Sequence, residues 1–262
     1  MNSKSIPNDY ENLSWPEVKN IASKKGSTII WPFGAVEQHG PQLPLATDSI
    51  FVDEIVNEVL KLIPEEIPLK KFPTQYFGFS PEHIGFDGTI TLSSSLMTNL
   101  IVEVGSQLSE IGFDRLILLN GHGGQISLLN TASRELKNIA PDLSIFPCFL
   151  WSGVDGLSDL IPKSELENGL HASLAETSLM LKMKPELVGD ERPYENINAQ
   201  IPKGWSLEGD APLAWVTKEL SNSGVIGDSR GANEELGHDL KKLLINHWYN
   251  MLLSLMSSDW PC

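Results

Sequence analysis

The sequence has few cysteines and few basic residues for its length. Its 262 residues include only two cysteines, Cys148 and Cys262. Two are too few for a disulfide framework, which fits a reducing compartment. Lysine and arginine total 19 against 34 aspartates and glutamates, a formal charge of -15 at pH 7. Nucleic-acid phosphates and anionic lipids would be repelled by such a surface, so we expect neither nucleic acid nor a membrane as a partner.

The chain also lacks the apolar segments that direct proteins into or across membranes. Residues 1–10 contain no apolar stretch of the kind that a secretory signal needs. Residues 243–256 are apolar in part, but polar side chains such as Asn246 and Asn250 interrupt them, and the segment is too short to span a bilayer. We therefore expect a soluble, cytoplasmic protein.

What the sequence does contain is an alternation of strands and helices. Apolar, β-branched runs at residues 27–31, 114–120 and 143–151 indicate buried strands. Residues 69–77 also resemble a strand, but Pro73 interrupts them, which is typical of a strand near the edge of a sheet. Helical spacing is found at about residues 14–25, 48–60, 96–108, 125–139, 171–183 and 232–256. The alternation predicts one α/β domain over residues 1–262, a three-layer α/β/α sandwich around a mostly parallel sheet. Residues 189–231 show no clear pattern.

The loop at residues 32–48 concentrates side chains that can bind metals. Glu37 and His39 are two residues apart, so an extended backbone projects both to one side, and Asp48 begins the following helix. Loops at the carboxyl ends of strands are where α/β folds place their sites. Alternatively, Asp48 only caps the helix and the other two side chains are exposed loop residues.

Further candidates follow in later parts of the chain. His122 lies among glycines directly after a strand, and His171 and Glu176 fall in a predicted helix. Imidazoles and carboxylates together suit a pair of divalent ions, bridged by a carboxylate such as Asp48, with an acidified water between them as hydroxide nucleophile. The Gly-His-Gly-Gly turn could instead bind phosphate, although it lacks the Gly-Lys-Ser/Thr of a P-loop.

Taken together, these stretches resemble the creatininase (creatinine amidohydrolase) family. The resemblance extends over nearly the whole chain, and the long first stretch makes it specific. It rests on Pro-Phe-Gly-Ala-Val-Glu-Gln-His-Gly-Pro-Gln-Leu-Pro-Leu-Ala-Thr-Asp at 32–48, Ser-Pro-Glu-His…Gly-Thr-Ile at 80–90, Asn-Gly-His-Gly-Gly-Gln at 120–125, His-Ala-Ser-Leu-Ala-Glu-Thr-Ser at 171–178, Gly-Val-Ile-Gly-Asp at 224–228 and Ala-x-x-Glu-x-Gly at 232–237.

The resemblance implies an α/β/α sandwich that holds two divalent ions, Zn²⁺ paired with Zn²⁺, Mn²⁺ or Fe²⁺. It implies that Glu37, His39, Asp48 and His122 are ligands, with Asp48 as the bridge, and that Glu176 is the remaining carboxylate. It also implies a homo-oligomer, often a hexamer in this family. The expected substrate is a small-molecule amide.

Candidate catalytic and substrate-binding residues lie in the same motifs. We expect His171 to act as a general acid toward the leaving nitrogen, with Glu176 as the second catalytic residue. A local hydrogen bond is the alternative role for His171. The segment of Glu82 and His83 either lines the substrate mouth or ties down a loop. The substrate-binding residues that we expect are Glu82, His83, Gly123 and Gly124.

Four positions, in three places, depart from the family pattern. Gly124 stands where creatininase proper has a glutamate ligand, which shifts that duty to Glu176 and weakens the case for creatinine as substrate. Gln42 replaces a frequent histidine, and Ser173-Leu174 replaces Gly-Glu. We predict a metal-dependent hydrolase of a non-peptide C–N bond in a cyclic amide, carboxamide or formamide. The alternative is a catalytically altered member that binds a ligand or partner without turnover.

Overall fold

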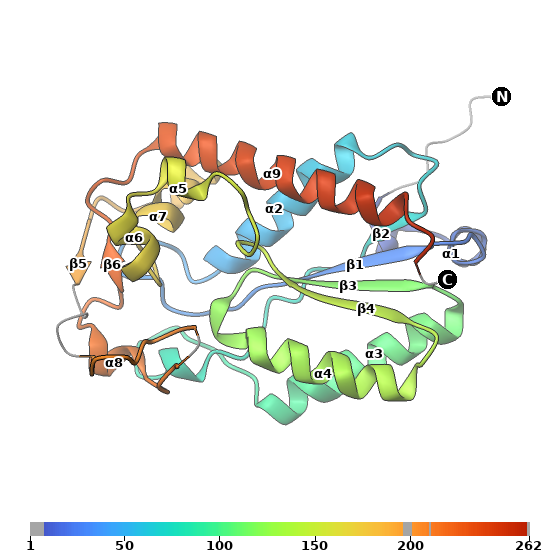
Figure 1. The fold of residues 1–262 in the computed structure, drawn as a ribbon, viewed down its shortest axis with the longest axis horizontal. Helices are drawn as coiled ribbons and strands as arrows, with labels where there is room; N and C mark the ends of the chain where they lie inside the picture. Colours follow the sequence, from blue (N-terminus) through green and yellow to red (C-terminus); the bar gives the residue numbers. More distant parts are fainter. Residues whose placement is uncertain (1–7, 196–200, 210, 261–262) are drawn as a thin grey trace.

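Four parallel strands form the centre of the molecule in the computed structural model, which describes residues 8–195, 201–209 and 211–260 (Figure 1). Residues 1–7 and Cys262, on which two of the expectations depend, lie outside this range. The strands are β1 (Thr28–Phe33), β2 (Leu69–Lys71), β3 (Arg115–Asn120) and β4 (Ser144–Phe149), in the order β2-β1-β3-β4. The short β2 lies at an edge, as Pro73 predicts.

The pairing register brings the carboxyl ends of three strands to one level. Phe33 at the end of β1 lies opposite Asn120 of β3, which in turn lies opposite Phe149 of β4. The loops that leave these strands therefore start side by side. This edge is where an open α/β sheet provides a site.

Helices cover both faces of the sheet, which confirms the three-layer α/β/α prediction (Figure 1). One face packs on α2 (Thr47–Leu62), α7 (Leu174–Met183) and α9 (Glu234–Met256), and the other on α1 (Trp15–Ala22), α3 (Ser94–Ile111) and α4 (Ile126–Ile139). Strand residues alternate between the two cores: Ile117 and Leu119 face the first, Leu116 and Leu118 the second. The result is a single domain.

Helix ends agree with the local sequence signals. Glu17 accepts hydrogen bonds from the Ser14 backbone N–H at 2.7 Å and from its hydroxyl at 2.6 Å, at the start of α1. Helix α3 ends at Gly112, whose φ of 109° lies in the left-handed region that glycine adopts without strain. Asn233 caps α9 by accepting from the Leu236 N–H at 2.9 Å.

Short elements gather beyond the carboxyl edge of the sheet. They are α5 (Leu157–Leu160), α6 (Lys163–Asn168), β5 (Tyr194–Glu195), α8 (Thr217–Leu220) and β6 (Gly227–Asp228), together with the 3-10 helices η2 (Pro81–His83), η3 (Gly123–Gln125) and η4 (Pro185–Leu187). The 3-10 helix η1 (Tyr10–Asn12) lies elsewhere, where Tyr10 packs on Phe113 just before β3. Strands β5 and β6 pair in antiparallel fashion. The stretch 189–231, which has no clear pattern in sequence, therefore carries β5, α8 and β6.

One predicted boundary is wrong in a place that matters. His171 does not lie in a helix; its backbone pairs with Ile226 in an isolated bridge, and α7 starts at Leu174. The cause is Ala172, whose φ of 52° cannot continue a helix. Within the described ranges, no helix is long and apolar enough to cross a membrane.

Candidate metal centre

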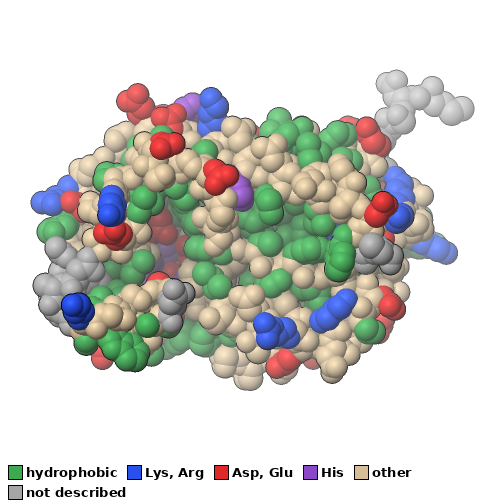
Figure 2. Space-filling view, viewed as in Figure 1, with side chains coloured by type: hydrophobic (Ala, Val, Ile, Leu, Met, Phe, Trp, Pro, Cys, Tyr) green, Lys and Arg blue, Asp and Glu red, His purple; other side chains and the backbone are tan. Residues whose placement is uncertain are grey.

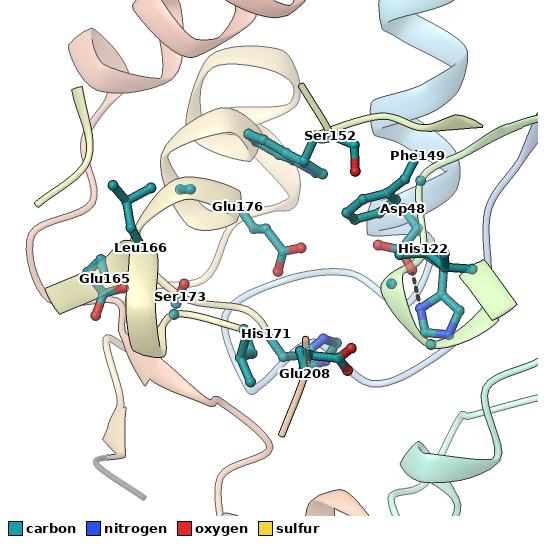
Figure 3. Close-up of a pocket in the computed structure, with 18 of the residues that line it drawn as sticks. Asp48, His122, Phe149, Ser152, Glu165, Leu166, His171, Ser173, Glu176 and Glu208 are labelled. Carbon is teal, nitrogen blue, oxygen red and sulfur yellow. Dashed lines mark ion pairs between the residues drawn. The ribbon is translucent and has the colours of Figure 1, made fainter. Parts of the chain in front are cut away.

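A cavity of about 420 Å³ opens at the carboxyl edge of the sheet. Figure 2 shows a hollow on the side of the molecule where α5, α6 and α8 lie, with acidic side chains at its depth. Figure 3 shows Asp48 and Glu176 projecting into this pocket from two different helices, with His122 and His171 beside them. The sequence candidates thus come together in one place.

The loop after β1 carries two of these groups into the interior. Glu37 is held by its backbone N–H, which donates to the Leu45 carbonyl at 2.9 Å, and the backbone of His39 pairs with Leu43. Both side chains are fully buried. The alternative that they are exposed loop residues is therefore wrong.

Asp48 faces two histidines with its two carboxylate oxygens. Its Oδ1 lies 3.2 Å from His39 Nε2, and its Oδ2 lies 3.3 Å from His122 Nδ1. It sits in the first turn of α2, but Ala46 occupies the N-cap position and no side-chain cap is formed. Asp48 is 2% exposed. Its burial therefore serves something other than the capping role.

Several buried oxygens of this cluster lack a hydrogen-bond partner among the described residues: both carboxylate oxygens of Glu37, and Oδ2 of Asp48. Glu37 Oε1 lies 3.0 Å from His122 Nδ1, yet the contact is not aligned as a hydrogen bond. Leaving a buried charge in this state is unfavourable by about 1–3 kcal/mol or more. Such atoms fit a site that a cation completes.

The donor set supports the same interpretation. Oxygen and nitrogen atoms lie within 4.8 Å of one another in each of the groups Glu37/His39/Asp48 and His39/His171/Glu176. Mixed imidazole and carboxylate ligands suit zinc, iron and manganese. The residues present therefore fit a divalent metal centre.

His39 is oriented as a metal ligand would be. Its Nδ1 lies 3.2 Å from the Glu37 backbone carbonyl, which can only accept, so Nδ1 carries the proton. Nε2 is then left to face Asp48. Anchoring one ring nitrogen so that the other meets the metal is the usual arrangement for histidine ligands.

The turn after β3 presents His122. Its backbone N–H donates to Asn120 Oδ1 at 2.9 Å, and Gln125 Nε2 donates to the same oxygen at 2.8 Å. This backbone amide is therefore occupied, and the carboxylates of Glu82 and Glu208 line the cavity beside the turn. Both features disfavour the phosphate alternative.

His171 and Glu176 reach the site from a strained turn. Ala172, in its left-handed conformation, donates its N–H to Glu176 Oε2 at 2.6 Å, and its carbonyl accepts from Gln42 Nε2 at 2.8 Å. Thr177 Oγ1 donates to the same carbonyl at 3.1 Å. Strained residues that persist because their surroundings fix them cluster at functional sites. Gln42 thus has a defined task, which is to hold this turn.

His83 supports Glu37 from behind. The Gln38 side-chain oxygen accepts from the Gly40 N–H at 2.9 Å, which identifies Gln38 Nε2 as the donor to His83 Nδ1 at 2.8 Å. The proton of His83 is therefore on Nε2, which faces Glu37 Oε1 at 3.3 Å. His83 thus has its expected place in the pocket wall and also lies next to a candidate ligand.

Burial and neighbouring charges shift the titration of the cluster. Burial raises the pKa of Glu37 to about 7, against the attraction of His122. Burial likewise raises the pKa of Glu176 to about 6. For His39, burial alone would lower the pKa, but Asp48 and other carboxylates raise it to about 9. Burial and the nearby His39 hold the pKa of His171 well below its usual range, so its imidazole is neutral.

The cavity also contains residues that the sequence did not indicate. Glu165 and Glu208 line it, as Figure 3 shows, together with the apolar side chain of Phe149. Neither glutamate belongs to a recognised motif: Glu165 lies in α6, shortly before His171, and Glu208 lies in the stretch 189–231, which has no clear sequence pattern. All the expected substrate-binding residues, Glu82, His83, Gly123 and Gly124, do line the cavity.

Comparisons with known proteins support these observations. The profile of the creatininase family, described as creatinine amidohydrolase, matches residues 11–252. A mycofactocin precursor peptide peptidase of Mycobacterium tuberculosis is 29% identical over 225 residues, covering 84% of this chain and 82% of that protein. A creatinine amidohydrolase of Pseudomonas putida is 26% identical over 204 residues, covering 72% of this chain and 77% of that protein.

Solved structures share the fold. A manganese creatininase superposes with a TM-score of 0.76 at 21% identity, covering 97% of this chain and all of that one. A creatininase variant of zinc–zinc type superposes with a TM-score of 0.77 at 22% identity, covering 98% of this chain and all of that one. At these identities the likeness concerns the fold.

Proposed function

This chain belongs to the creatininase family, and we propose that it is a metal-dependent hydrolase that cleaves a non-peptide C–N bond in a small amide. The substrates in view are a cyclic amide, a carboxamide or a formamide. The observation that carries the proposal is Asp48, a buried carboxylate whose two oxygens face two different imidazoles. A carboxylate so placed suits a bridge between two ions.

Two ligand sets share this bridge. His122 lies close to Glu37 and Asp48, and His39 lies close to Asp48 and Glu176. We assign Glu37, Asp48 and His122 to one ion, and His39, Asp48 and Glu176 to the other. Zn²⁺ paired with Zn²⁺, Mn²⁺ or Fe²⁺ suits these donors. When bound, such ions polarise the scissile carbonyl and make water acidic enough to attack near neutral pH.

His171 is placed to move the proton of the reaction. Its Nε2 lies 2.7 Å from the Gln38 backbone carbonyl, so the proton is on Nε2 and Nδ1 carries the lone pair. Nδ1 lies 4.0 Å from Glu37 Oε1, on the side of the ligand cluster. His171 therefore accepts a proton at Nδ1 from the attacking water and then, as general acid, delivers it to the leaving nitrogen.

The charge of the cavity favours neutral or cationic substrates. Its wall includes five carboxylates, Asp48, Glu82, Glu165, Glu176 and Glu208, and the described lining contains no lysine or arginine. Two bound dications would offset part of this charge, but Glu165 and Glu208 lie outside both ligand sets. A substrate with a free carboxylate would be repelled by these two side chains, with no basic side chain in the described lining to offset the repulsion.

A peptide amide is a second candidate substrate. The mycobacterial relatives at 29% identity are named as precursor peptide peptidases. A second cavity of about 530 Å³ shares Glu82, Gly124 and Glu208 with the first, which leaves room for a longer chain. The absence of a basic side chain in the described lining counts against recognition of a terminal carboxylate.

Binding of a ligand or partner without turnover is the alternative function, which would make the protein a binding protein and not an enzyme. Gln42 and Leu174, which depart from the family pattern, are the residues that raise it. Gln42 Nε2 donates to the Ala172 carbonyl, and neither Gln42 nor Leu174 is among the described residues that line the cavity. Their places in the packing are compatible with an intact centre.

Metal content of the purified wild type beside Asp48→Ala, measured by elemental analysis, tests the proposal. We expect about two ions per chain in the wild type, and at most one in the variant. Release of amine from neutral, cationic and anionic amides and short peptides is then measured on the same preparations. Glu66→Gln, a change of one exposed carboxylate, serves as control.

Three outcomes separate the candidates. A folded wild type without ions after incubation with zinc, manganese or iron would contradict the hydrolase and favour binding alone. Two ions with turnover of peptides only would replace the small-amide proposal by the peptide one. Two ions with preference for neutral or cationic amides would support the proposal as stated.

A further inference from the structure

His122 and His39 differ in what holds the ring nitrogen that points away from Asp48. His39 uses the Glu37 backbone carbonyl. His122 Nδ1 faces Glu37 and Asp48, and its Nε2 faces the carboxylate of Glu82, with Oε1 at 3.0 Å. This contact is an ion-pair approach without the alignment of a hydrogen bond. The Glu82 carboxylate therefore faces the outer ring nitrogen of His122, whereas the backbone carbonyl of Glu37 faces that of His39.

The space for this contact depends on Gly124. A Cβ at position 124 would collide with the Glu82 carboxylate and would lie 2.6 Å from His122 Nε2. Gly124 is not among the described glycines with positive φ, so the backbone does not require glycine there. The requirement is for room between Glu82 and His122.

Glu82 is itself held in a well-fixed segment. It lies in η2 beside His83, whose Nδ1 meets Gln38 Nε2 at 2.8 Å and Thr217 Oγ1 at 2.9 Å. The Glu82 side chain is 13% exposed. The segment that carries this carboxylate is therefore held through hydrogen bonds of His83 to Gln38 and Thr217, neither of which belongs to the two proposed ligand sets.

We propose that Glu82 is a positioning residue that acts through His122, and that Gly124 provides the room for it. The Glu82 carboxylate attracts the Nε2–H of His122 across this 3.0 Å approach, which orients the ring and directs the Nδ1 lone pair toward Glu37 and Asp48. A carboxylate behind a histidine ligand also raises the basicity of that ligand. The inference rests on the metal centre of the proposed function and gives Glu82 a role other than substrate binding.

Zinc affinity of the chelator-treated, refilled protein tests this assignment. Zinc is titrated against a chromophoric competitor with wild type, Glu82→Gln and Gly124→Ala. We expect each variant to bind zinc about 10–100-fold more weakly, the usual effect of losing an outer carboxylate, with unchanged ion number at saturation. The control is Glu208→Gln, which removes a charge from the same cavity without an ion pair to His122, and should change affinity less than about threefold.

Two further measurements distinguish positioning from a general structural effect. The double variant Glu82→Gln/Gly124→Ala should bind zinc with the affinity of whichever single variant binds it less tightly, because both changes break the same contact. In nitrogen-15 NMR of the zinc-loaded protein, the Nε2–H signal of His122 should shift in Glu82→Gln but not in Glu208→Gln.

Each contrary outcome overturns the proposal in a recognisable way. Wild-type affinity in Glu82→Gln excludes positioning. Loss of one ion at saturating zinc makes Glu82 a ligand, and a change confined to KM returns it to substrate binding. A wild type that binds no zinc refutes the metal centre itself, which separates failure of the proposed function from failure of this inference alone.

Discussion

The two ends of β3 both bury charge, and they do so in opposite ways. Arg115 begins the strand and is 2% exposed, yet its guanidinium donates to the backbone carbonyls of Leu255, Ser258 and Trp260. His122 follows the other end, beside Glu37 and Asp48, whose inward oxygens lack hydrogen-bond partners among the described residues. One strand therefore has a buried charge with hydrogen-bond partners at its first residue, and buried charges that lack some of theirs beyond its last.

The contrast teaches how to separate structural from functional burial. At the amino end, the donors of Arg115 meet acceptors that the chain itself supplies, and the contact fastens the end of α9 to the sheet. At the carboxyl end, carboxylates and imidazoles converge without completing one another. An unsatisfied buried group persists in a native protein when a ligand or a catalytic task requires it.

The amino end is where we expect the largest loss of stability. Arg115→Met keeps the apolar stem but leaves several carbonyls without donors, so the free energy of unfolding should fall by about 2–4 kcal/mol. Urea unfolding measures the change, with the exposed Arg134→Met as control. Zinc bound per folded chain should stay at the wild-type value. A fall in zinc stoichiometry at full folding would show that the two ends are not independent.

At the carboxyl end, removing a charge should stabilise the metal-free protein. Glu37→Gln replaces a buried carboxylate that has no hydrogen-bond partner among the described residues. In chelator the variant should therefore gain about 1–3 kcal/mol in unfolding free energy, while zinc binds at least about tenfold more weakly. The exposed Glu66→Gln should change neither quantity. Destabilisation of the metal-free variant would mean that Glu37 is satisfied by the protein alone.

The same variant predicts a pH dependence with a definite sign. Burial raises the pKa of Glu37 to about 7. In the metal-free wild type, the protonated side chain favours the fold below about pH 4.5, and that contribution is lost as the pH rises through about 7. The stabilisation by Glu37→Gln should therefore be larger above pH ~7 than below pH ~5. Equal gains at both ends of this range would exclude a charged Glu37 as the cause.

The sequence predicted the sheet, and the proximity of the side chains that we propose as ligands, for a physical reason. The strands are continuous apolar runs, and the side chains Glu37, His39 and Asp48 lie within one short loop whose position is set by β1. The cluster is thus encoded locally. The expected homo-oligomer and the cytoplasmic location stay predictions.

What the sequence missed depends on contacts between distant segments. His171 was placed in a helix because its neighbours have helical propensity, whereas Gln42, 130 residues earlier, holds Ala172 in a left-handed conformation. The pairing of Glu195 with Gly227 and the arrival of Glu208 in the cavity likewise arise from tertiary packing. No local pattern carries that information.

Gln42 tests whether that strained turn belongs to the functional side of the comparison. Gln42→Met keeps the volume but removes the donor to the Ala172 carbonyl, while Thr177 still donates to it. We expect a loss of about 1 kcal/mol in unfolding free energy. Turnover measured on fully folded protein should also fall, because His171 directly precedes this turn and depends on it for its position. The exposed Gln107→Met is the control. Unchanged turnover would assign Gln42 to stability alone.

A half-buried carboxylate with complete pairing gives the smallest expected effect. Glu54 on α2 meets Lys184 Nζ at 2.9 Å and Lys241 Nζ at 3.0 Å, and these contacts lower its pKa against the effect of burial. Glu54→Gln should therefore destabilise the fold by about 0.5–1 kcal/mol at neutral pH. Because the folded pKa is lowered, this contribution should be present above the unfolded value and vanish as the pH falls below the folded one. Urea unfolding at neutral and acidic pH measures this change, and bound zinc should stay at the wild-type value. That result would group Glu54 with Arg115 as a structural charge. A loss larger than that of Arg115→Met would show that pairing, rather than depth of burial, decides how much each charge contributes to stability.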